Sequence, residues 1–236
     1  MDHRIVSRSE WLESRRALVV KEKEFDRRRD ELSRERRDLP WERVEKDYVF
    51  DGPNGRESLA DLFAGKSQLI VYHFMFAPEW EEGCKSCSFW ADNLERLPVH
   101  LRHRDTTLIA VSRAPFAKLD AYAKRLGWTF KWVSSGGSDF NYDYSVSFPK
   151  NETSRALTEY NFGTSTSDRR YVGEEFPGIS VFYKDKAGQV FHTYSCYARG
   201  IDMMNNAYHY LDLTPKGRDE GDGIMAWLRR NDEYKD

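Results

Sequence analysis

Residues 69–87, which read LIVYHFMFAPEWEEGCKSC, constrain the fold more than any other stretch of the sequence. They open with a short apolar run, residues 69–76, which is rich in Ile, Val, Tyr and Phe and lies between turn-forming residues. A run of this kind is typical of a strand that is buried on both faces. A loop and the motif Cys84-Lys85-Ser86-Cys87 follow, and apolar residues then recur at helical spacing. The sequence therefore predicts a strand, a loop, a Cys-x-x-Cys motif and a helix, in that order.

This placement of the two cysteines predicts a redox dithiol. A thiol at the start of a helix faces unpaired backbone N–H groups and the positive end of the helix dipole. Both favour the thiolate, which is the nucleophilic form of cysteine. Cys87 lies one turn further on, where it can attack a mixed disulfide and release the partner. We therefore expect Cys84 to be the attacking thiolate and Cys87 the resolving thiol.

Two other interpretations of this pair stay open, namely metal ligands and incidental core thiols. A zinc site needs about four ligands, and no second Cys-x-x-Cys supplies the rest. The third cysteine, Cys196, lies alone in a strand-like segment. We expect it to be a small core residue, and a third thiol for a longer disulfide relay is the alternative.

Length and charge set the broad class of the protein. A chain of 236 residues is enough for one sizeable domain with appendages. The net charge is −2 with both signs mixed, so nothing calls for nucleic acid or an anionic membrane as a partner. The N-terminal sequence lacks the apolar core of a secretory signal, and no apolar run is long enough to span a bilayer. A cytoplasmic protein is expected.

The N-terminal 42 residues are predicted to be a charged helical extension. Residues 7–38 form the helix, with Ser7 or Ser9 as its cap and Pro40 beyond its end. Its apolar residues recur every seven positions: Trp11, Leu18, Phe25, Leu32 and Leu39. One apolar residue per heptad is too little to bury alone. Packing along its own domain and a homodimer contact are the two interpretations of this helix.

Alternating strand and helix patterns follow. Residues 48–59 read as a hairpin, residues 106–111 as a second buried strand, and a helix begins near Pro115 and ends at Gly127. Residues 128–132 alternate in polarity and suit a third strand. This order implies parallel strands with right-handed crossovers.

The second half of the chain is less regular. Residues 134–150 fit either a strand or a short helix, and residues 151–170 are polar and expected to be irregular. Residues 178–183 and 189–196 then predict an antiparallel hairpin, and residues 203–211 a last helix. Residues 214–236 form a mostly polar tail.

Two of these features together resemble the thioredoxin fold. One is the strand, loop, Cys-x-x-Cys and helix, and the other is Phe176-Pro177 leading into a strand, a tight turn and a strand. The resemblance implies an α/β thioredoxin-like domain, a central mixed sheet flanked by helices, over residues 43–213. It further implies that Pro177 is a cis-proline that faces the dithiol, where Phe176 and Pro177 help to bind the substrate; X–Pro bonds tolerate the cis form.

More narrowly, the chain resembles a bacterial thioredoxin-like family of unknown function, domain of unknown function 899. The similarity extends over nearly the whole chain and includes EEGCKSCSFWAD, FPGISVFYKD and YHYLDLTPKGRDE. Members of this family are predicted to be dithiol–disulfide oxidoreductases. The resemblance implies a protein or small-molecule disulfide as substrate. The dithiol itself carries the electrons, so neither a bound cofactor nor a metal is implied.

The resemblance gives His73 a candidate role. His73 lies in the apolar strand, at the place where thioredoxin has a buried acid that moves the proton of the resolving cysteine. A neutral imidazole can serve this purpose near neutral pH, if it lies within reach of Cys87. The alternative is a hydrogen-bonded core histidine. Trp80 and Trp90 flank the dithiol, and they either line a docking surface for the substrate or pack the loop and the helix.

Charges near Cys84 leave the direction of its pKa shift open. Three acids, Glu79, Glu81 and Glu82, precede Cys84 and tend to raise its pKa, whereas Lys85 acts the other way. Two other functions compete with thiol–disulfide exchange. One is a peroxidase in which Cys84 passes through a sulfenic acid, although the Pro-x-x-x-Thr-x-x-Cys pattern typical of peroxiredoxins is missing. The other is a redox-inactive binding module that keeps the fold.

Overall fold

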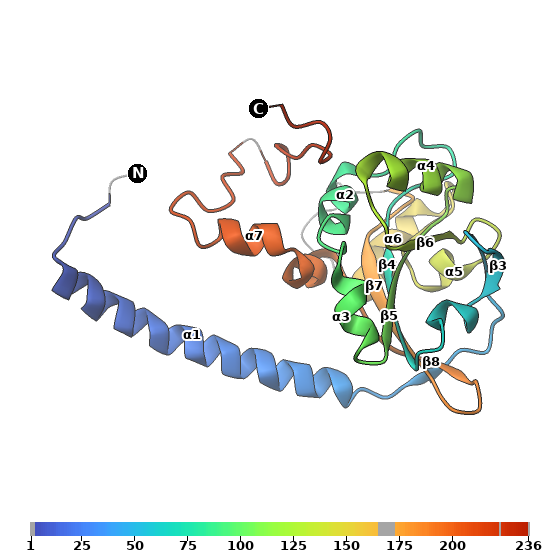
Figure 1. The fold of residues 1–236 in the computed structure, drawn as a ribbon, viewed down its shortest axis with the longest axis horizontal. Coiled ribbons are helices and arrows are strands. Elements are labelled where there is room, and N and C mark those ends of the chain that lie inside the picture. Colours follow the sequence, from blue (N-terminus) through green and yellow to red (C-terminus); the bar gives the residue numbers. More distant parts are fainter. Residues whose placement is uncertain (1–2, 165–172, 222, 236) are drawn as a thin grey trace. The chain divides into compact units, whose positions relative to one another are not determined.

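The structure is a computed structural model that describes residues 3–164, 173–221 and 223–235. The chain divides into two compact units, Met1–Pro40 and Trp41–Asp236. The first unit contains the long helix α1, Arg8–Arg37, and the second contains the sheet and the dithiol (Figure 1).

Helix α1 begins with a capping box. The backbone N–H of Ser7 donates to the Glu10 carboxylate at 2.9 Å, and the Ser7 hydroxyl accepts from the Glu10 N–H at 3.4 Å. No residue of α1 is buried. The side chains that recur every seven residues, Trp11, Leu18, Phe25, Leu32 and Leu39, are 45–65% exposed. The predicted helix is present, and the side chains of its apolar seam are exposed.

The second unit contains an eight-stranded mixed sheet within the described residues, in the order β1-β8-β7-β4-β5-β6-β2-β3. Strands β4, β5 and β6 are parallel, whereas β7 runs antiparallel to β4 and β8 antiparallel to β7. The strands are β1 Glu42–Arg43, β2 Val49–Gly52, β3 Gly55–Ser58, β4 Gln68–His73, β5 Thr106–Ser112, β6 Lys131–Ser134, β7 Gly178–Lys184 and β8 Val190–Tyr197. With the Cys-x-x-Cys helix following β4, this is a thioredoxin-like α/β fold, as expected.

Helices cover both faces of the sheet. One buried cluster joins α2, α4 and α7 to one face through Trp90, Leu119 and Tyr208. Another cluster joins η1 and α5 to the opposite face through Phe63 and Phe140. The helical segments of this unit are η1 Asp61–Phe63, α2 Lys85–Ala91, α3 Leu97–Arg102, α4 Phe116–Leu126, α5 Phe140–Asp143, η2 Thr153–Arg155, α6 Ala156–Glu159, η3 Tyr160–Gly163, η4 Ala198–Met204 and α7 Asn206–Leu211.

Most local predictions match these elements. The hairpin at 48–59 is β2 and β3, and Gly55 at its turn has φ +89°, a value that favours glycine. The strand expected at 128–132 begins later, at Lys131, although Trp128, Phe130 and Trp132 are all buried in the cluster with α2 and α4. The undecided region contains short helices and one bridge, Ser147 to Glu175. The part of the expected irregular segment at 165–172 lies outside the described residues.

Residues 214–235, expected to be a tail, pack against the sheet unit where they are described. Leu228 is fully buried. The Trp227 ring lies 5.7 Å from that of Phe89 on α2, edge to face. Across the described residues, no helix combines the length and the apolar character needed to cross a membrane.

Candidate functional site

The dithiol lies where the chain leaves β4 and returns to begin α2. Phe74, Met75 and Phe76 continue the apolar run past the end of β4 and are buried. The backbone N–H of Cys84 donates to the Met75 carbonyl at 3.1 Å, which closes the loop between them. Cys84 is the N-cap of α2, so its side chain lies at the unpaired N–H groups of the helix.

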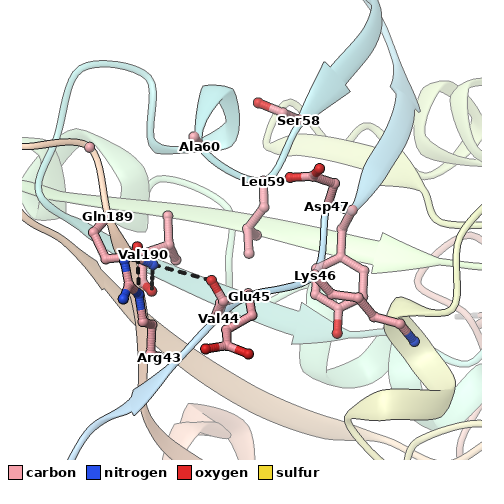
Figure 2. A pocket seen from close by; sticks show the side chains of 12 residues that line it. Arg43, Val44, Glu45, Lys46, Asp47, Ser58, Leu59, Ala60, Gln189 and Val190 are labelled. Atoms are coloured by element: carbon pink, nitrogen blue, oxygen red, sulfur yellow. Dashed lines mark hydrogen bonds between the residues drawn. The ribbon is translucent and has the colours of Figure 1, made fainter.

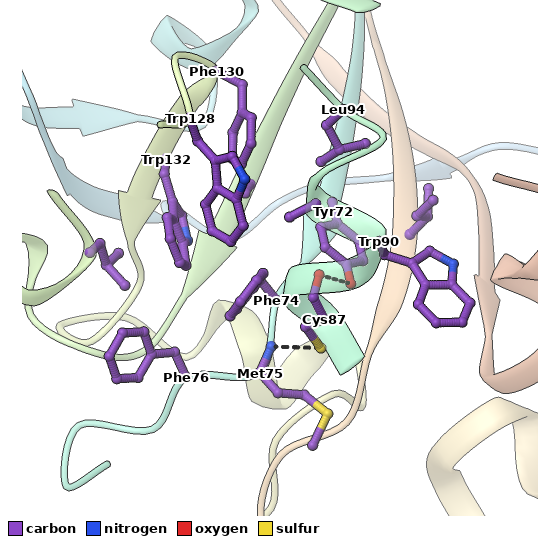
Figure 3. Packing of buried hydrophobic residues seen from close by; sticks show 14 of the residues in the cluster. Tyr72, Phe74, Met75, Phe76, Cys87, Trp90, Leu94, Trp128, Phe130 and Trp132 are labelled. Atoms are coloured by element: carbon purple, nitrogen blue, oxygen red, sulfur yellow. Dashed lines mark hydrogen bonds between the residues drawn. The ribbon is translucent and has the colours of Figure 1, made fainter. Parts of the chain in front are cut away.

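The two thiols differ in exposure and in contacts. Neither is in a disulfide, and Cys84 is partly exposed whereas Cys87 is 2% exposed. Figure 3 shows two hydrogen bonds around Cys87. The Met75 backbone N–H donates to its Sγ at 3.5 Å, and the Tyr72 hydroxyl donates to its carbonyl at 3.3 Å. Cys87 is therefore held inside the core, with Cys84 nearer to solvent.

The site shifts the two thiol pKa values in opposite directions. The Cys87 S–H donates to Cys84 and, together with the backbone N–H groups of Cys87 and Ser86, lowers the pKa of Cys84 to about 6 against the opposing effect of burial. Burial raises the pKa of Cys87 well above its ordinary value. At neutral pH these opposite shifts favour a thiolate at Cys84 beside a protonated thiol at Cys87.

The three acids before Cys84 lie close to basic side chains. Glu82 lies 2.8 Å from Arg230 and also contacts Arg125. Glu79 lies 3.7 Å from Lys150, and Glu81 lies 4.0 Å from Lys118. These basic side chains offset the three negative charges, so the acids raise the pKa of Cys84 less than their position in the sequence suggests.

The role predicted for His73 is wrong on geometric grounds. Successive residues of a strand point to opposite faces. Tyr72 belongs to the cluster that contains Cys87, whereas His73 lies against Phe140 and Tyr144 on the other face, with ring centroids 5.6 and 6.2 Å away. His73 is therefore separated from Cys87 by the sheet itself.

His73 instead belongs to a buried polar chain. Its Nε2 pairs with the Ser180 hydroxyl at 2.8 Å, Ser180 with Ser195 at 2.8 Å, and Ser195 with Nε2 of His192 at 2.7 Å. Burial lowers the pKa of His73 to about 3. The imidazole is therefore a neutral core group, as in the alternative interpretation.

Pro177 lies beside the dithiol, but the isomer of its peptide bond differs from the one expected. The Phe176–Pro177 peptide bond is trans, so the predicted cis-proline is wrong; the trans form is also the favoured one for X–Pro bonds, by about 0.5–1 kcal/mol. Phe176 is buried against Phe148 and Tyr160 rather than exposed to a substrate. Gly178 follows, and a Cβ there would lie 2.5 Å from Cδ1 of Tyr197.

A buried ion pair holds the start of this segment. Nε of Arg113 donates to Oε1 of Glu175 at 2.6 Å, and the Ser147 hydroxyl donates to Oε2 at 2.7 Å. The Glu175 side chain is 1% exposed and that of Arg113 14%. Glu175 lies two residues before Pro177, so this pair anchors the loop beside the dithiol.

An apolar pocket of about 230 Å³ opens beside Cys87. Pro177 forms one wall, and Trp80, predicted to face the substrate, is absent from the lining and packs half-buried against the core. The lining residues that matter here are Tyr72, Cys87, Trp90, Pro177, Ile201 and Met225. Of the predicted binding residues, Pro177 and Trp90 line the pocket beside Cys87, whereas Phe176 and Trp80 do not.

Two functional candidates escaped the sequence analysis. Tyr72 reads as a core residue, although its alternation with His73 could have placed it on the face of the sheet opposite that histidine. Arg230 reaches the loop before Cys84 from the far end of the chain and donates to the Gly83 carbonyl at 3.0 Å. No local pattern marks Arg230 as part of the site, because the contacts that place it there, with Tyr122 and Gly83, are 108 and 147 residues away.

The other predicted groups do not add to the site. Cys196 is buried on β8, opposite Ile179. Within the described ranges, no three His, Cys, Asp or Glu side chains gather as metal ligands would.

A larger pocket, of about 530 Å³, lies at the other end of β7 and β8 (Figure 2). The register places Gly178 beside His73, whereas Lys184 and Val190, next to this pocket, are at the opposite end of the hairpin. Gln189 fills part of it and bonds to the Val44 carbonyl at 3.2 Å. This pocket is polar and remote from both thiols.

Comparison with known proteins identifies the family. A family model described as "Bacterial protein of unknown function (DUF899)" matches residues 1–234. The chain belongs to this family. No curated protein matches it in sequence.

Several solved structures are similar to this DUF899 chain at low identity. Peroxiredoxin Q of Xanthomonas campestris matches with a TM-score of 0.47 and 15% identity over 73% of this chain and 98% of that one. A peroxidoxin of Mycobacterium tuberculosis matches with a TM-score of 0.45 and 11% identity over 73% and 97%. Peroxiredoxin 6 of Arenicola marina gives 0.45 and 11% over 75% and 76%. Likenesses at this level do not bear on the reaction of this chain.

Proposed function

We propose that this protein is a thiol–disulfide oxidoreductase that uses Cys84 and Cys87. The observation that carries the proposal is the opposite direction of the two pKa shifts: Cys84, partly exposed at the start of α2, has a pKa of about 6, whereas that of buried Cys87 is raised. A nucleophile needs the thiolate at working pH, and a resolving thiol must stay protonated until the mixed disulfide has formed.

The reaction proceeds by two exchanges. The Cys84 thiolate attacks one sulfur of the substrate disulfide, whose S–S bond breaks, and the first substrate thiolate leaves and takes a proton from water. Cys87 then loses its proton to water and attacks Sγ of Cys84. The mixed disulfide breaks, and the second substrate thiolate leaves and takes up a proton. The substrate gains two electrons and the dithiol becomes a disulfide, which an external dithiol must reduce for the next cycle.

The pocket beside Cys87 supports a substrate with an apolar group close to its disulfide. Its lining by Tyr72, Trp90, Pro177 and Met225 offers few polar partners. Burial of an apolar group there is favourable by about 25 cal/mol for each Å² removed from water. A protein or small-molecule disulfide of this kind is the proposed substrate.

Reduction of insulin disulfides with dithiothreitol as electron donor tests the proposal. Wild type is expected to accelerate the reaction, and Cys84→Ser to abolish the acceleration. Cys87→Ser is expected to accumulate a mixed disulfide on Cys84, visible by mass spectrometry. Cys196→Ser is the matched control and should behave as wild type. Equal rates for wild type and Cys84→Ser would exclude the mechanism.

A peroxide arm of the same experiment separates the competing function. If Cys84 is instead a peroxidatic cysteine, hydrogen peroxide will be consumed faster than insulin is reduced, and a sulfenic acid will be trapped on Cys84 in Cys87→Ser. A dithiol that stays reduced under mild oxidant would point to a binding module.

A further inference from the structure

The last described segment of the chain, residues 223–235, contacts both ends of the dithiol helix α2. Its Trp227 packs on Phe89 of α2, and Asn231 donates to Asp92 at the end of α2 at 2.8 Å. Met225 lines the pocket beside Cys87. The segment thus touches α2 at both ends, although it follows α2 by more than a hundred residues.

Arg230 connects this segment to the residue that precedes Cys84. Its Nη2 donates to the Gly83 carbonyl at 3.0 Å, and its Nε donates to the Tyr122 hydroxyl at 2.6 Å. The Arg230 side chain is 15% exposed. A planar guanidinium that donates along two directions fixes the two acceptors relative to each other.

Further hydrogen bonds connect Tyr122 to Cys84. The Tyr122 hydroxyl lies 3.0 Å from the Ser88 hydroxyl, which donates to the Cys84 carbonyl at 3.0 Å. Arg230 is therefore linked to the residue before Cys84 directly and to Cys84 through two hydroxyl groups. These are the atoms that set where the chain enters α2.

We propose that Arg230 is a positioning residue of the dithiol site, which holds Gly83 and Cys84 so that the Cys84 sulfur meets its N–H and S–H donors. The proposal rests on the proposed function, in which Cys84 is the reactive thiolate. Those donors are groups of Ser86 and Cys87, whose reach to the sulfur depends on the backbone at Cys84. Arg230, although remote in sequence, thus helps to stabilise the Cys84 thiolate by holding Cys84 within reach of its hydrogen-bond donors.

Several charged and titratable groups surround this arrangement. Glu82 and Glu233 lie 2.8 and 2.9 Å from Arg230 and offset its charge. Because these two carboxylates compete with the long-range effect of the guanidinium, the geometric effect of Arg230 is expected to exceed its coulombic one. The groups that face Arg230 or Cys84 are Tyr72, Glu82, Cys87, Tyr122, Arg125 and Glu233.

The test is the rate of Cys84 alkylation by iodoacetamide against pH, followed by mass spectrometry on the reduced full chain in a Cys196→Ser background. The wild-type midpoint is expected near pH 6. Arg230→Met should move the midpoint upward by about one pH unit, since lost hydrogen bonds to a thiolate raise its pKa. Arg230→Lys keeps one donor and the charge and should move it less. Arg229→Met, which alters the neighbouring exposed arginine, should leave it unchanged.

Thermal unfolding of each variant separates positioning from plain stability. A merely structural Arg230 would lower the unfolding midpoint and leave the alkylation midpoint at the wild-type value, and this result would overturn the proposal. If Arg230→Met does not fold, Tyr122→Phe decides. It keeps Arg230 and removes the hydroxyl that bonds to Arg230, to Ser88 and to the Gly83 carbonyl, so it should shift the alkylation midpoint in the same direction. Alkylation needs no disulfide substrate, so a wild type inactive on insulin would refute the proposed function without touching this readout.

Discussion

The Tyr72 hydroxyl donates to the Cys87 carbonyl at 3.3 Å, inside the same apolar cluster as the Cys87 thiol. Burial raises the pKa of Tyr72 well above its ordinary value, so the phenol keeps its proton and remains a donor. Tyr72 also lowers the pKa of Cys87 through a side-chain hydrogen bond. The Tyr72 hydroxyl is therefore placed to help Cys87 lose its proton.

Replacement of Tyr72 by Phe is therefore expected to slow the second exchange. The pKa of Cys87 should rise, and the mixed disulfide on Cys84 should persist several-fold longer in quenched-flow mass spectrometry. The free energy of unfolding should fall by only about 1 kcal/mol. Tyr48→Phe, which removes a hydroxyl bonded to Asp143, is the control. A mixed-disulfide lifetime equal to that of wild type would exclude this role.

His73 predicts a pH dependence of stability rather than of turnover. Its pKa is about 3 in the folded state and about 6.5 when unfolded. The unfolded state thus binds a proton first as pH falls, so stability is full above pH 6.5 and declines down to pH 3. The loss attributable to His73 should be about 3 kcal/mol at pH 4.

Urea unfolding of wild type and His73→Gln between pH 4 and pH 7 measures this term. The variant should be less stable than wild type at pH 7 and lose less stability on acidification. Its turnover at pH 7, corrected for the folded fraction, should stay within about twofold of wild type, a difference of under 0.5 kcal/mol in activation free energy. A large loss of turnover would restore His73 to the reaction.

The Arg113–Glu175 pair predicts an asymmetric double-mutant cycle. Arg113→Leu leaves Glu175 charged and buried, and should cost about 3–5 kcal/mol at pH 7. Arg113→Leu combined with Glu175→Leu should recover much of that loss, because no buried charge is left unpaired. Urea unfolding of the four proteins gives the coupling. Additive losses would show that the two charges do not act as a pair.

The exposed seam of α1 predicts self-association, which we propose as the role of this helix. Side chains such as Phe25, 65% exposed, gain most from burial against a second copy. Light scattering after size exclusion should show a dimer for wild type and a monomer for Phe25→Glu/Leu32→Glu. Val20→Glu changes a residue off the seam that is equally exposed and should remain dimeric. A monomeric wild type would exclude this contact.

The sequence predicts the parts of the fold that depend on local patterns. The apolar run before Cys84 and the turn at Gly55 each specify their element, and β4 and the β2–β3 hairpin follow. The order of strands and helices then limits the topology to the thioredoxin-like one. The dithiol could be found for the same reason, since both cysteines lie within one turn of helix.

The remaining parts of the site depend on contacts between distant segments. Alternation along β4 places Tyr72 and His73 on opposite faces of the sheet. It does not say which face α2 covers, and for this reason the sequence could not show that His73 faces away from Cys87. Trp80 and Trp90 are equally aromatic in sequence, yet only Trp90 reaches the pocket. Arg230 has no sequence signature, because Gly83 and Tyr122 are distant in the sequence and approach it only in the folded protein.

Gly178 limits how this site can diverge. Its missing side chain leaves room for the Tyr197 ring, whose hydroxyl donates to the Tyr144 carbonyl at 3.0 Å. Larger residues there would displace that ring and push the neighbouring proline away from the thiols. Substitutions at Ile201 or Met225 can therefore change the shape of the cavity directly, whereas a side chain at position 178 would disturb the backbone that holds Pro177 beside it.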